Sequence, residues 1–338
     1  MKRKIIVPVS YMGSGSSAVT DLISEFENVN NKCGVFEYVF LHCPNGLFDL
    51  EDKLLIGNNA LRSDEALHSY LNTMKDLYDR KYWWVGNYKN NIGPGFYERT
   101  KKYVNDLTEY KLDNYWYMQE KNNIKMLFLI AMNKLIYYIS FKKIHLKKPL
   151  RYKPMLLSYV NDEKFYDVSK KYIYDIFDMI DSTGNDILLD QLVLPHNLKR
   201  VIKYFNEDTK FIVVDRDPRD VFISNKYIWA KNNEPVPYST NVEDFCNQYI
   251  GMRRIEEVVE DSNNILRIHF EDLIYDYEST KNRIIKFLGF ESKKHVNKFV
   301  RFNPELSIKN TKLFMNDKYS DEVKIIEKKL NEYLYFNN

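Results

Sequence analysis

KFIVVDRDPRDVFISNKY, residues 210–227, predicts a buried strand that passes through a short turn into a helix. The apolar run over residues 210–215 is typical of a strand covered on both faces, as in a parallel sheet. Asp217 is a preferred helix N-cap residue, and Pro218 suits the first helical position because no N–H is needed there. The stretch therefore predicts one strand–turn–helix unit of a parallel sheet.

Arg216 and Ser224 give this unit a candidate anion site. Arg216 follows the strand directly, and Ser224 lies in the early turns of the helix, where backbone N–H groups and the helix dipole favour negative charge. A phosphate fits such a place. The alternative is an arginine that only pairs with Asp217 or Asp220.

A second unit of the same kind is predicted in IIVPVSYMGSGSSAVTDLI, residues 5–23. Glycine lets the backbone approach a ligand closely, and serine hydroxyls add donors beside the free N–H groups of a helix start. The turn is not a Walker A loop, because no lysine follows its last glycine. We interpret it as a phosphate cradle of Gly13, Ser14, Gly15, Ser16 and Ser17.

The two units together resemble the sulfotransferases that use 3′-phosphoadenosine 5′-phosphosulfate (PAPS). Residues 216–224, RDPRDVFIS, match the family's R-x-P-R-D-x-x-x-S segment, and residues 265–290 resemble its strand, Glu-Asp-Leu and helix ending in Phe-Leu-Gly. The resemblance implies a P-loop-like, three-layer α/β sandwich whose parallel sheet has helices on both faces. It also implies that the first loop binds the 5′-phosphosulfate, that Arg216 and Ser224 bind the 3′-phosphate, and that PAP is the product.

Gly13 departs from the family pattern, whose first loop usually reads [RK]-[ST]-G-[ST]-[ST]. The family's basic residue stabilises the leaving phosphate. Three explanations stay open. Another cation reaches the site, with Lys309, Lys226 and Arg219 as candidates; or the loop N–H groups carry the developing charge; or the protein binds the nucleotide with little turnover. Lys309 lies in residues 307–311, SIKNT, which resemble the C-terminal segment that folds over the nucleotide in this family.

Glu37 is the candidate catalytic base. It lies within residues 34–40, GVFEYVF, whose apolar and aromatic content predicts a second strand. In several sulfotransferases of this broad family a glutamate after the first helix is the base, and Glu37 stands at the corresponding place. The alternative is a carboxylate at a strand end that faces water, and His42 is the second candidate base.

Residues 50–180 are predicted to form a mainly helical, aromatic-rich insertion that binds the acceptor. Aromatic faces flanked by polar side chains suit a sugar, so we expect a carbohydrate acceptor on a glycan or glycolipid. The alternative for any single aromatic residue is packing in the core. The candidate acceptor-binding tryptophans are Trp83, Trp84 and Trp116.

Asp190 and Gln191 lie at the carboxyl end of another expected strand, residues 186–190. Open α/β sheets bind ligands at the carboxyl ends of their strands, so both residues are placed on the acceptor side of the site. Asp190 is a candidate catalytic residue and Gln191 a candidate acceptor-binding residue. The alternative for Asp190 is a helix or turn cap.

IKMLFLIAMNKLIYYISF, residues 124–141, is the most apolar run of the chain. It approaches the length of a membrane span, but Lys125, Asn133 and Lys134 interrupt it, and we interpret it as a buried helix. The alternative is a peripheral membrane contact through this helix and the basic residues that follow.

Composition restricts the class of protein. The chain has 338 residues, 44% hydrophobic and 29% charged, with a formal net charge of +3, so a nucleic-acid partner is not expected. Cys33, Cys43 and Cys246 are odd in number and show no metal-ligand spacing, which indicates a reducing compartment and no metal. The first apolar run is short and interrupted by Pro8, so no signal peptide is predicted and a cytoplasmic location is expected.

We therefore hypothesise that residues 1–338 form a single sulfotransferase domain that moves a sulfuryl group from PAPS to an acceptor hydroxyl. Positioning and charge stabilisation supply most of the rate of such an in-line transfer, and Glu37 takes the proton as it leaves. Two rival hypotheses remain. A P-loop nucleotide kinase would require magnesium and ATP, and a PAPS-binding protein would show little turnover.

Overall fold

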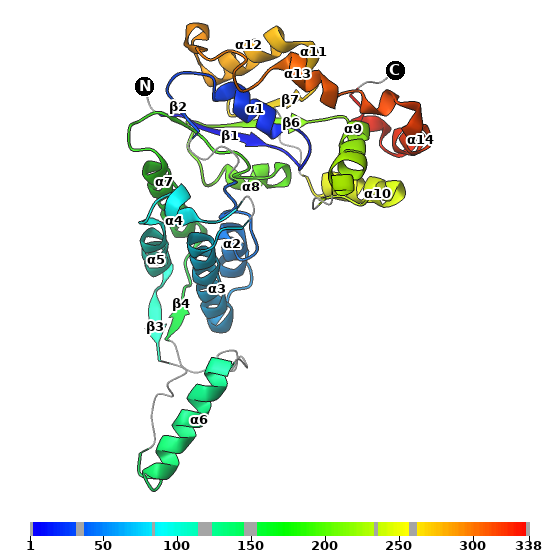
Figure 1. Cartoon of the computed structure of the whole chain (residues 1–338). Helices are drawn as coiled ribbons and strands as arrows, with labels where there is room; N and C mark the ends of the chain where they lie inside the picture. Colours follow the sequence, from blue (N-terminus) through cyan, green and yellow to red (C-terminus); the bar gives the residue numbers. More distant parts are fainter. Residues whose placement is uncertain are drawn as a thin grey trace.

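A five-stranded parallel sheet lies at the centre of the part of the chain that the structure describes (Figure 1). This computed structural model describes residues 3–31, 37–82, 85–113, 124–144, 154–232, 236–256 and 262–335. The strand order is β2, β5, β1, β6, β7, and each neighbouring pair is parallel. The strands of this sheet are β1 (Ile5–Val9), β2 (Val29–Asn30), β5 (Asp186–Leu188), β6 (Thr209–Asp215) and β7 (Ile265–His269).

Helices lie above and below this sheet, and an antiparallel pair of short strands lies apart from it (Figure 1). This arrangement confirms the predicted α/β fold with a parallel sheet. The separate pair is β3 (Tyr110–Leu112) with β4 (Met155–Leu157). The helices before β5 are α1 (Ser16–Ile23), α2 (Leu47–Leu55), α3 (Ala60–Asp79), α4 (Tyr88–Asn91), α5 (Phe96–Leu107), α6 (Ile124–Ile139) and α7 (Asp162–Ile180). The later helices are α8 (Leu198–Val201), α9 (Pro218–Ile223), α10 (Val242–Arg254), α11 (Asp272–Tyr275), α12 (Tyr277–Leu288), α13 (Pro304–Ser307) and α14 (Ser320–Lys329).

Successive residues of the central strands pack on opposite faces of the sheet. In β1, Ile5, Val7 and Val9 belong to the larger apolar core with residues of α2, α3, α5 and α7. Ile6 belongs to a second core with residues of α1, α11 and α12. Because both faces are buried, these strands have continuous apolar sequences rather than alternating ones.

The structure confirms both predicted strand–turn–helix units. β6 ends at Asp215 and α9 begins at Pro218, and the Asp217 carboxylate accepts the N–H of Arg219 at 2.9 Å as an N-cap. The helix continues as a π-helical turn over Ser224–Trp229, a geometry that often occurs at functional sites. β1 ends at Val9, and α1 begins at Ser16.

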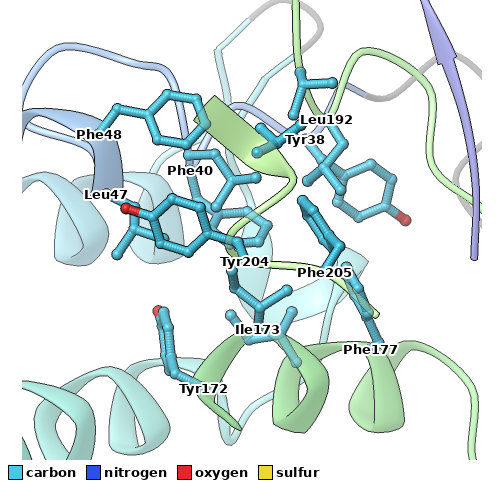
Figure 2. Close-up of a cluster of buried hydrophobic side chains, with 14 of the residues drawn as sticks. Tyr38, Phe40, Leu47, Phe48, Tyr172, Ile173, Phe177, Leu192, Tyr204 and Phe205 are labelled. Carbon is cyan, nitrogen blue, oxygen red and sulfur yellow. The ribbon is translucent and has the colours of Figure 1, made fainter. Parts of the chain in front are cut away.

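Aromatic side chains below the sheet pack mainly against one another, as Figure 2 shows for the cluster around Tyr204. Tyr88, Phe96 and Tyr103 of the insertion are at most 2% exposed. The hydroxyl of Tyr204 is buried as well and donates to Glu51 Oε2 at 2.8 Å. Packing in the core therefore accounts for these three aromatic residues, and they offer no surface to an acceptor.

The strand predicted for residues 34–40 is wrong over the part that is described. Residues 37–39 form no strand, residues 34–36 lie outside the described ranges, and the second strand is β2, earlier in the chain. Tyr38 and Phe40 are buried in the larger core. The aromatic content of this stretch thus reflects the packing of a loop on the core, which strand propensity does not distinguish from a strand.

The apolar run at residues 124–141 forms α6, but the helix is not buried as predicted. Ile124, Phe128 and Tyr138 are 87%, 63% and 65% exposed. α6 projects away from the sheet, beyond the β3–β4 pair (Figure 1). Among the helices that the structure describes, none is long and apolar enough to span a membrane.

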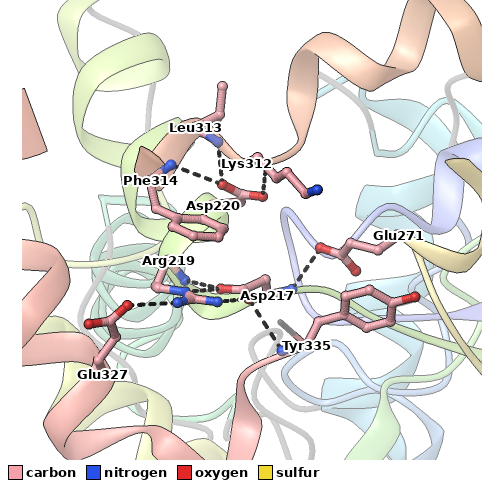
Figure 3. Close-up of polar contacts among 9 residues, drawn as sticks. All are labelled: Asp217, Arg219, Asp220, Glu271, Lys312, Leu313, Phe314, Glu327 and Tyr335. Carbon is pink, nitrogen blue, oxygen red and sulfur yellow. Dashed lines mark hydrogen bonds and ion pairs between the residues drawn. The ribbon is translucent and has the colours of Figure 1, made fainter. Parts of the chain in front are cut away.

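A buried polar network fixes the start of α9 against the C-terminal part of the chain (Figure 3). The carboxylate of Asp217 accepts from Nε and Nη2 of Arg219 at 3.0 and 2.7 Å and from the N–H of Tyr335 at 3.2 Å. The N–H of Asp217 donates to Glu271 Oε1 at 3.0 Å, and Arg219 Nη1 reaches Glu327 at 2.7 Å. The turn before α9 is therefore held from several directions.

Replacing Asp217 by Ala should lower the free energy of unfolding by about 3 kcal/mol or more. The variant removes the helix cap and leaves the Arg219 guanidinium buried without its main partner. Urea unfolding measures the loss. Asp321→Ala, at a fully exposed side chain, is the matched control and should change stability by less than about 1 kcal/mol. Equal stability of the two variants would show that the network does not hold the turn.

Candidate functional site

The loop between β1 and α1 requires glycine at two positions. Gly13 and Gly15 have φ of +85° and +94°, in the left-handed region that other residues rarely adopt. A Cβ at Gly15 would lie 2.7 Å from the Phe270 ring, and one at Gly13 would lie 3.1 Å from the Trp229 ring. The loop is thus shaped by backbone conformation and by close contact with two aromatic rings.

The start of α1 presents N–H groups to the space beside this loop. Within the described ranges, the N–H groups of Ser16 and Ser17 have no hydrogen-bond acceptor, as expected for the first turn of a helix. Gln191, in a left-handed conformation after β5, donates from Nε2 to the hydroxyls of Ser10 and Ser16 at 2.9 Å each. Gln191 therefore braces the end of β1 against the start of α1.

Arg216 reaches across from the end of β6 to the same loop. Its guanidinium donates to the carbonyl of Gly13 at 2.9 Å, to the hydroxyl of Ser224 at 3.2 Å and to the carbonyl of Asn310 at 2.6 Å. Arg216 is only 7% exposed, its Nε has no partner, and it forms no ion pair among the described residues. Within the described part of the chain, this buried cation is thus held by three neutral oxygen atoms and lies 5.3 Å from the centre of the Phe270 ring.

The three carboxylates whose charge acts on Arg216 are hydrogen-bonded to other groups, and Figure 3 draws these contacts. Asp220 accepts the N–H groups of Lys312 and Leu313 at 2.8 Å each, and Glu271 accepts the N–H of Asp217. Burial lowers the pKa of Arg216, and the charges of Asp220, Glu271 and Asp217 raise it in opposition. These acids raise the pKa of the guanidinium from a distance, but among the described residues they accept no hydrogen bond from it.

The predicted residues meet at one cavity of about 560 Å³. Its lining joins the first loop, the turn after β5, the end of β6 and the π-helical turn. Nine of the residues predicted to act here line it, namely Gly13, Gly15, Ser16, Ser17, Glu37, Asp190, Gln191, Arg216 and Ser224. Arg216 also lines a second cavity of about 380 Å³ with Tyr249, Arg253 and His269.

Asp190 lines the cavity, whereas His42 only contacts a residue that does. Burial raises the pKa of Asp190 to about 6, and Oδ1 of this carboxyl has no partner in the described part of the chain. Nε2 of His42 lies 3.0 Å from the carbonyl oxygen of Gln191, so it carries the proton and donates. Burial lowers the pKa of His42, which does not line the cavity. His42 supports the turn that carries Asp190.

Other predicted residues lie away from the cavity. Ser14 is buried and Lys309 is exposed, and neither lines it. Of the cations considered as a replacement for a basic residue at Gly13, Arg219 pairs with Asp217 and Glu327, and Lys226 pairs with Glu322 at 2.5 Å. Trp83, Trp84 and Trp116 lie outside the described residues.

Several lining residues were missed by sequence reasoning. Trp229 stands five residues after Ser224, a spacing that shares a face on a π-helical turn but not on a regular α-helix, so the sequence carried no signal for it. Asn310, beside Lys309, contributes its backbone carbonyl, so its residue type carries no signal. The other missed lining residues are Ser10, Met12, Leu194, Ile228 and Phe270.

A model of the sulfotransferase family matches residues 94–294, more than half of the chain. The chain belongs to the sulfotransferase family. The matched range contains Arg216 and Ser224 of this sulfotransferase-family protein, whereas the loop with Gly13 and Gly15 precedes it. The family match therefore includes the part of the cavity lining that Arg216 and Ser224 form, but not the part that the first loop forms.

Individual sulfotransferases are similar to the chain over shorter ranges or at low identity. Sulfotransferase 2A6 of Rattus norvegicus is 31% identical over 94 residues, which cover 25% of this chain and a third (33%) of the length of that curated relative. The solved structure of the sulfotransferase domain from the curacin biosynthetic pathway is 12% identical with a TM-score of 0.39, and the match covers 97% of this chain and 98% of that chain. The structure of retinol dehydratase in complex with androsterone and inactive cofactor PAP is also 12% identical. Its TM-score is 0.35, and the match covers 100% of this chain and 82% of that chain.

Asp190→Asn should change the pH dependence of stability in this sulfotransferase-family protein. The pKa of Asp190 is higher in the folded state than in the unfolded chain, so the protonated carboxyl favours the folded state. This contribution to the free energy of unfolding is complete below about pH 4 and is lost as the pH rises through about 6. The variant cannot titrate. Relative to the wild type it should therefore be more stable at pH 8 than at pH 4.5, by on the order of 2 kcal/mol in urea unfolding.

Asp106→Asn, at an exposed position of α5, is the matched control for this experiment. If the two variants show the same pH dependence, burial does not raise the pKa of Asp190.

Proposed function

We propose that the chain is a single-domain enzyme that transfers a sulfuryl group from PAPS to an acceptor hydroxyl, with residues 50–180 contributing to acceptor binding. Arg216 carries the proposal. Removing a cation from water is costly unless an anion or several hydrogen bonds compensate, and this guanidinium is buried with neutral partners only. A phosphate group would supply the missing negative charge.

The residues around the cavity fit such a nucleotide. Unfilled donors are present at Arg216 Nε and at the N–H groups of Ser16 and Ser17, and the cavity volume is in the usual range for ligand sites. Arg216 and Ser224 would hold the 3′-phosphate, and the first loop would hold the 5′-phosphosulfate at the start of α1. When bound, PAPS supplies the sulfuryl group, whose sulfur exchanges its bond to the 5′-phosphate oxygen for one to the acceptor oxygen, and PAP is the product.

Arg216 also takes the place of the basic residue that is absent at Gly13. Its guanidinium donates to the Gly13 carbonyl, so a positive charge lies directly beside the first loop. A long side chain at position 13 would meet the Trp229 ring. Glycine at this position and tryptophan at position 229 therefore belong together, with Arg216 and the free N–H groups of α1 stabilising negative charge in the loop.

Glu37 lines the cavity and is the proposed base. A carboxylate is a weak base for an alcohol, so it takes the acceptor proton as the new bond forms rather than before. The wall that includes Met12, Ile228 and Trp229 is apolar, while Glu37 and Asp190 are polar. An aromatic ring beside carboxylates suits the C–H face and hydroxyls of a sugar, and we propose a carbohydrate or glycolipid acceptor.

Adenosine 3′,5′-bisphosphate should bind the wild type without metal and more tightly than ATP, as measured by titration calorimetry with and without magnesium. Arg216→Ala should weaken this binding on the order of 100-fold, because a charged phosphate contact is lost. Ser224→Ala should weaken it about tenfold while leaving the buried guanidinium in place.

Arg99→Ala is the matched control, since Arg99 pairs with Asp175 on the surface of the helical layer. It should bind the bisphosphate as the wild type does. Tighter binding of ATP with magnesium, or unchanged binding by both site variants, would contradict the proposed nucleotide site.

Glu37→Gln should lower kcat by about 100-fold or more without changing affinity for the bisphosphate, because the amide cannot accept the proton. Transfer of radiolabelled sulfate from PAPS to a panel of oligosaccharides and glycolipids measures kcat. Glu305→Gln, at an exposed residue of α13, is the control. A variant as active as the wild type excludes Glu37 as the base, and a wild type that binds the bisphosphate but sulfates none of the panel excludes the carbohydrate acceptor.

A further inference from the structure

α6 exposes a continuous apolar face to solvent. The exposed positions recur every three or four residues, which places them along one side of the helix. They extend over the full length of α6, and the helix projects beyond the β3–β4 pair, far from the sheet (Figure 1). The residues of this α6 face, each at least half exposed, are Ile124, Leu127, Phe128, Leu135, Tyr138 and Ile139.

The charged residues of α6 and of the segment that follows it have a single sign. Lys134, Lys142 and Lys143 are exposed on the helix and directly after it. From Lys121 to Asn161 the sequence contains nine Lys and Arg residues and no Asp or Glu, although the whole chain has a formal net charge of only +3. In the sequence, positive charge is therefore concentrated in and after the segment that forms α6.

This charge argues against a second copy of the chain as the partner. Two copies meeting through α6 would bring like charges together, and the apolar contact would be opposed by repulsion. A surface with negative charge and an apolar layer beneath it complements both features. Bilayers with anionic headgroups have that composition.

The length of α6 determines how it would lie on a bilayer. Sixteen residues at about 1.5 Å each give a helix of about 24 Å, shorter than the apolar thickness of about 30 Å. Lys134 lies within the helix, where its long stem allows the ammonium group to reach the headgroups. Tyr137 and Tyr138 have the amphipathic rings that favour the membrane–water boundary. A helix that lies parallel to the bilayer surface is consistent with its length, with Lys134 and with the two tyrosines.

We propose that α6 docks the protein on a lipid surface that carries anionic headgroups. The α6 face enters the boundary between headgroups and acyl chains, and Lys134, Lys142 and Lys143 contact the anionic groups. This docking is independent of the proposed sulfuryl transfer.

Vesicle flotation tests the proposal on the full chain. The vesicles are phosphatidylcholine alone and phosphatidylcholine with phosphatidylglycerol at roughly 2:1. The wild type should float with the mixed vesicles at least about tenfold more than with the neutral ones, and the difference should shrink as salt is raised. Equal binding to both vesicles, or no binding to either, overturns the proposal.

The apolar part is tested by Phe128→Asp combined with Leu135→Asp. This variant should lose at least about tenfold in flotation, because two side chains that would enter the bilayer become charged. Val300→Asp combined with Leu306→Asp is the matched control, since both residues are highly exposed elsewhere on the surface. The proposal is overturned if the control loses as much as the α6 variant.

The charged part is tested by Lys142→Glu combined with Lys143→Glu, which should reduce flotation with the mixed vesicles at least about tenfold. Lys293→Glu combined with Lys324→Glu makes the same change in net charge at two exposed lysines away from α6. Similar losses in the two variants would show that net charge rather than α6 drives binding, and would overturn the proposal.

Two further measurements separate this proposal from others. Analytical ultracentrifugation without lipid should show that the variant with Phe128→Asp and Leu135→Asp has the same oligomeric state as the wild type. If the wild type is a dimer and the variant a monomer, a second copy of the chain covers the α6 face, and the proposal is overturned. Calorimetry with adenosine 3′,5′-bisphosphate should give wild-type affinity for every α6 variant. Failure of the wild type in that assay concerns the nucleotide site and leaves the vesicle result intact.

Discussion

The parallel pairing of β1 with β6 is the constraint on which the rest of the site depends. Their register aligns Ile5 with Thr209 and Val9 with Val213, so the two strands reach their carboxyl ends side by side. The loop after β1 and the turn after β6 must then occupy neighbouring space. The Gly13 carbonyl consequently lies within hydrogen-bond distance of Arg216, although the two residues are 203 positions apart.

Within that arrangement, the distribution of charge decides what Arg216 is available to do. Asp217 is committed to Arg219 and to capping α9, Asp220 to the backbone of the following C-terminal turn, and Glu271 to the N–H of Asp217. Each carboxylate satisfies backbone or side-chain donors that would otherwise be buried without partners. The network thus stabilises the fold and leaves one guanidinium with neutral partners at the cavity.

The helical layer below the sheet has two surfaces with different roles. Its aromatic residues form a core with the sheet and satisfy buried hydroxyl groups, as Tyr204 does with Glu51. α6 extends from the same layer but keeps its apolar residues outside. The cavity and the α6 face are therefore separate parts of one chain, with the helical layer and the β3–β4 pair between them. A substitution in one of them does not touch the other.

The sequence by itself determined the features that depend on neighbouring residues. Apolar runs predicted β1 and β6, the cap at Asp217 predicted the start of α9, and glycines predicted a loop whose backbone can approach a ligand closely, because all of these follow from local backbone preferences. Only the tertiary structure decided that Gln191 braces α1, that Trp229 covers Gly13, that residues 37–39 form a loop and that α6 is exposed. Those outcomes depend on which distant side chains come into contact, and local pattern carries no information about the partner of an apolar face.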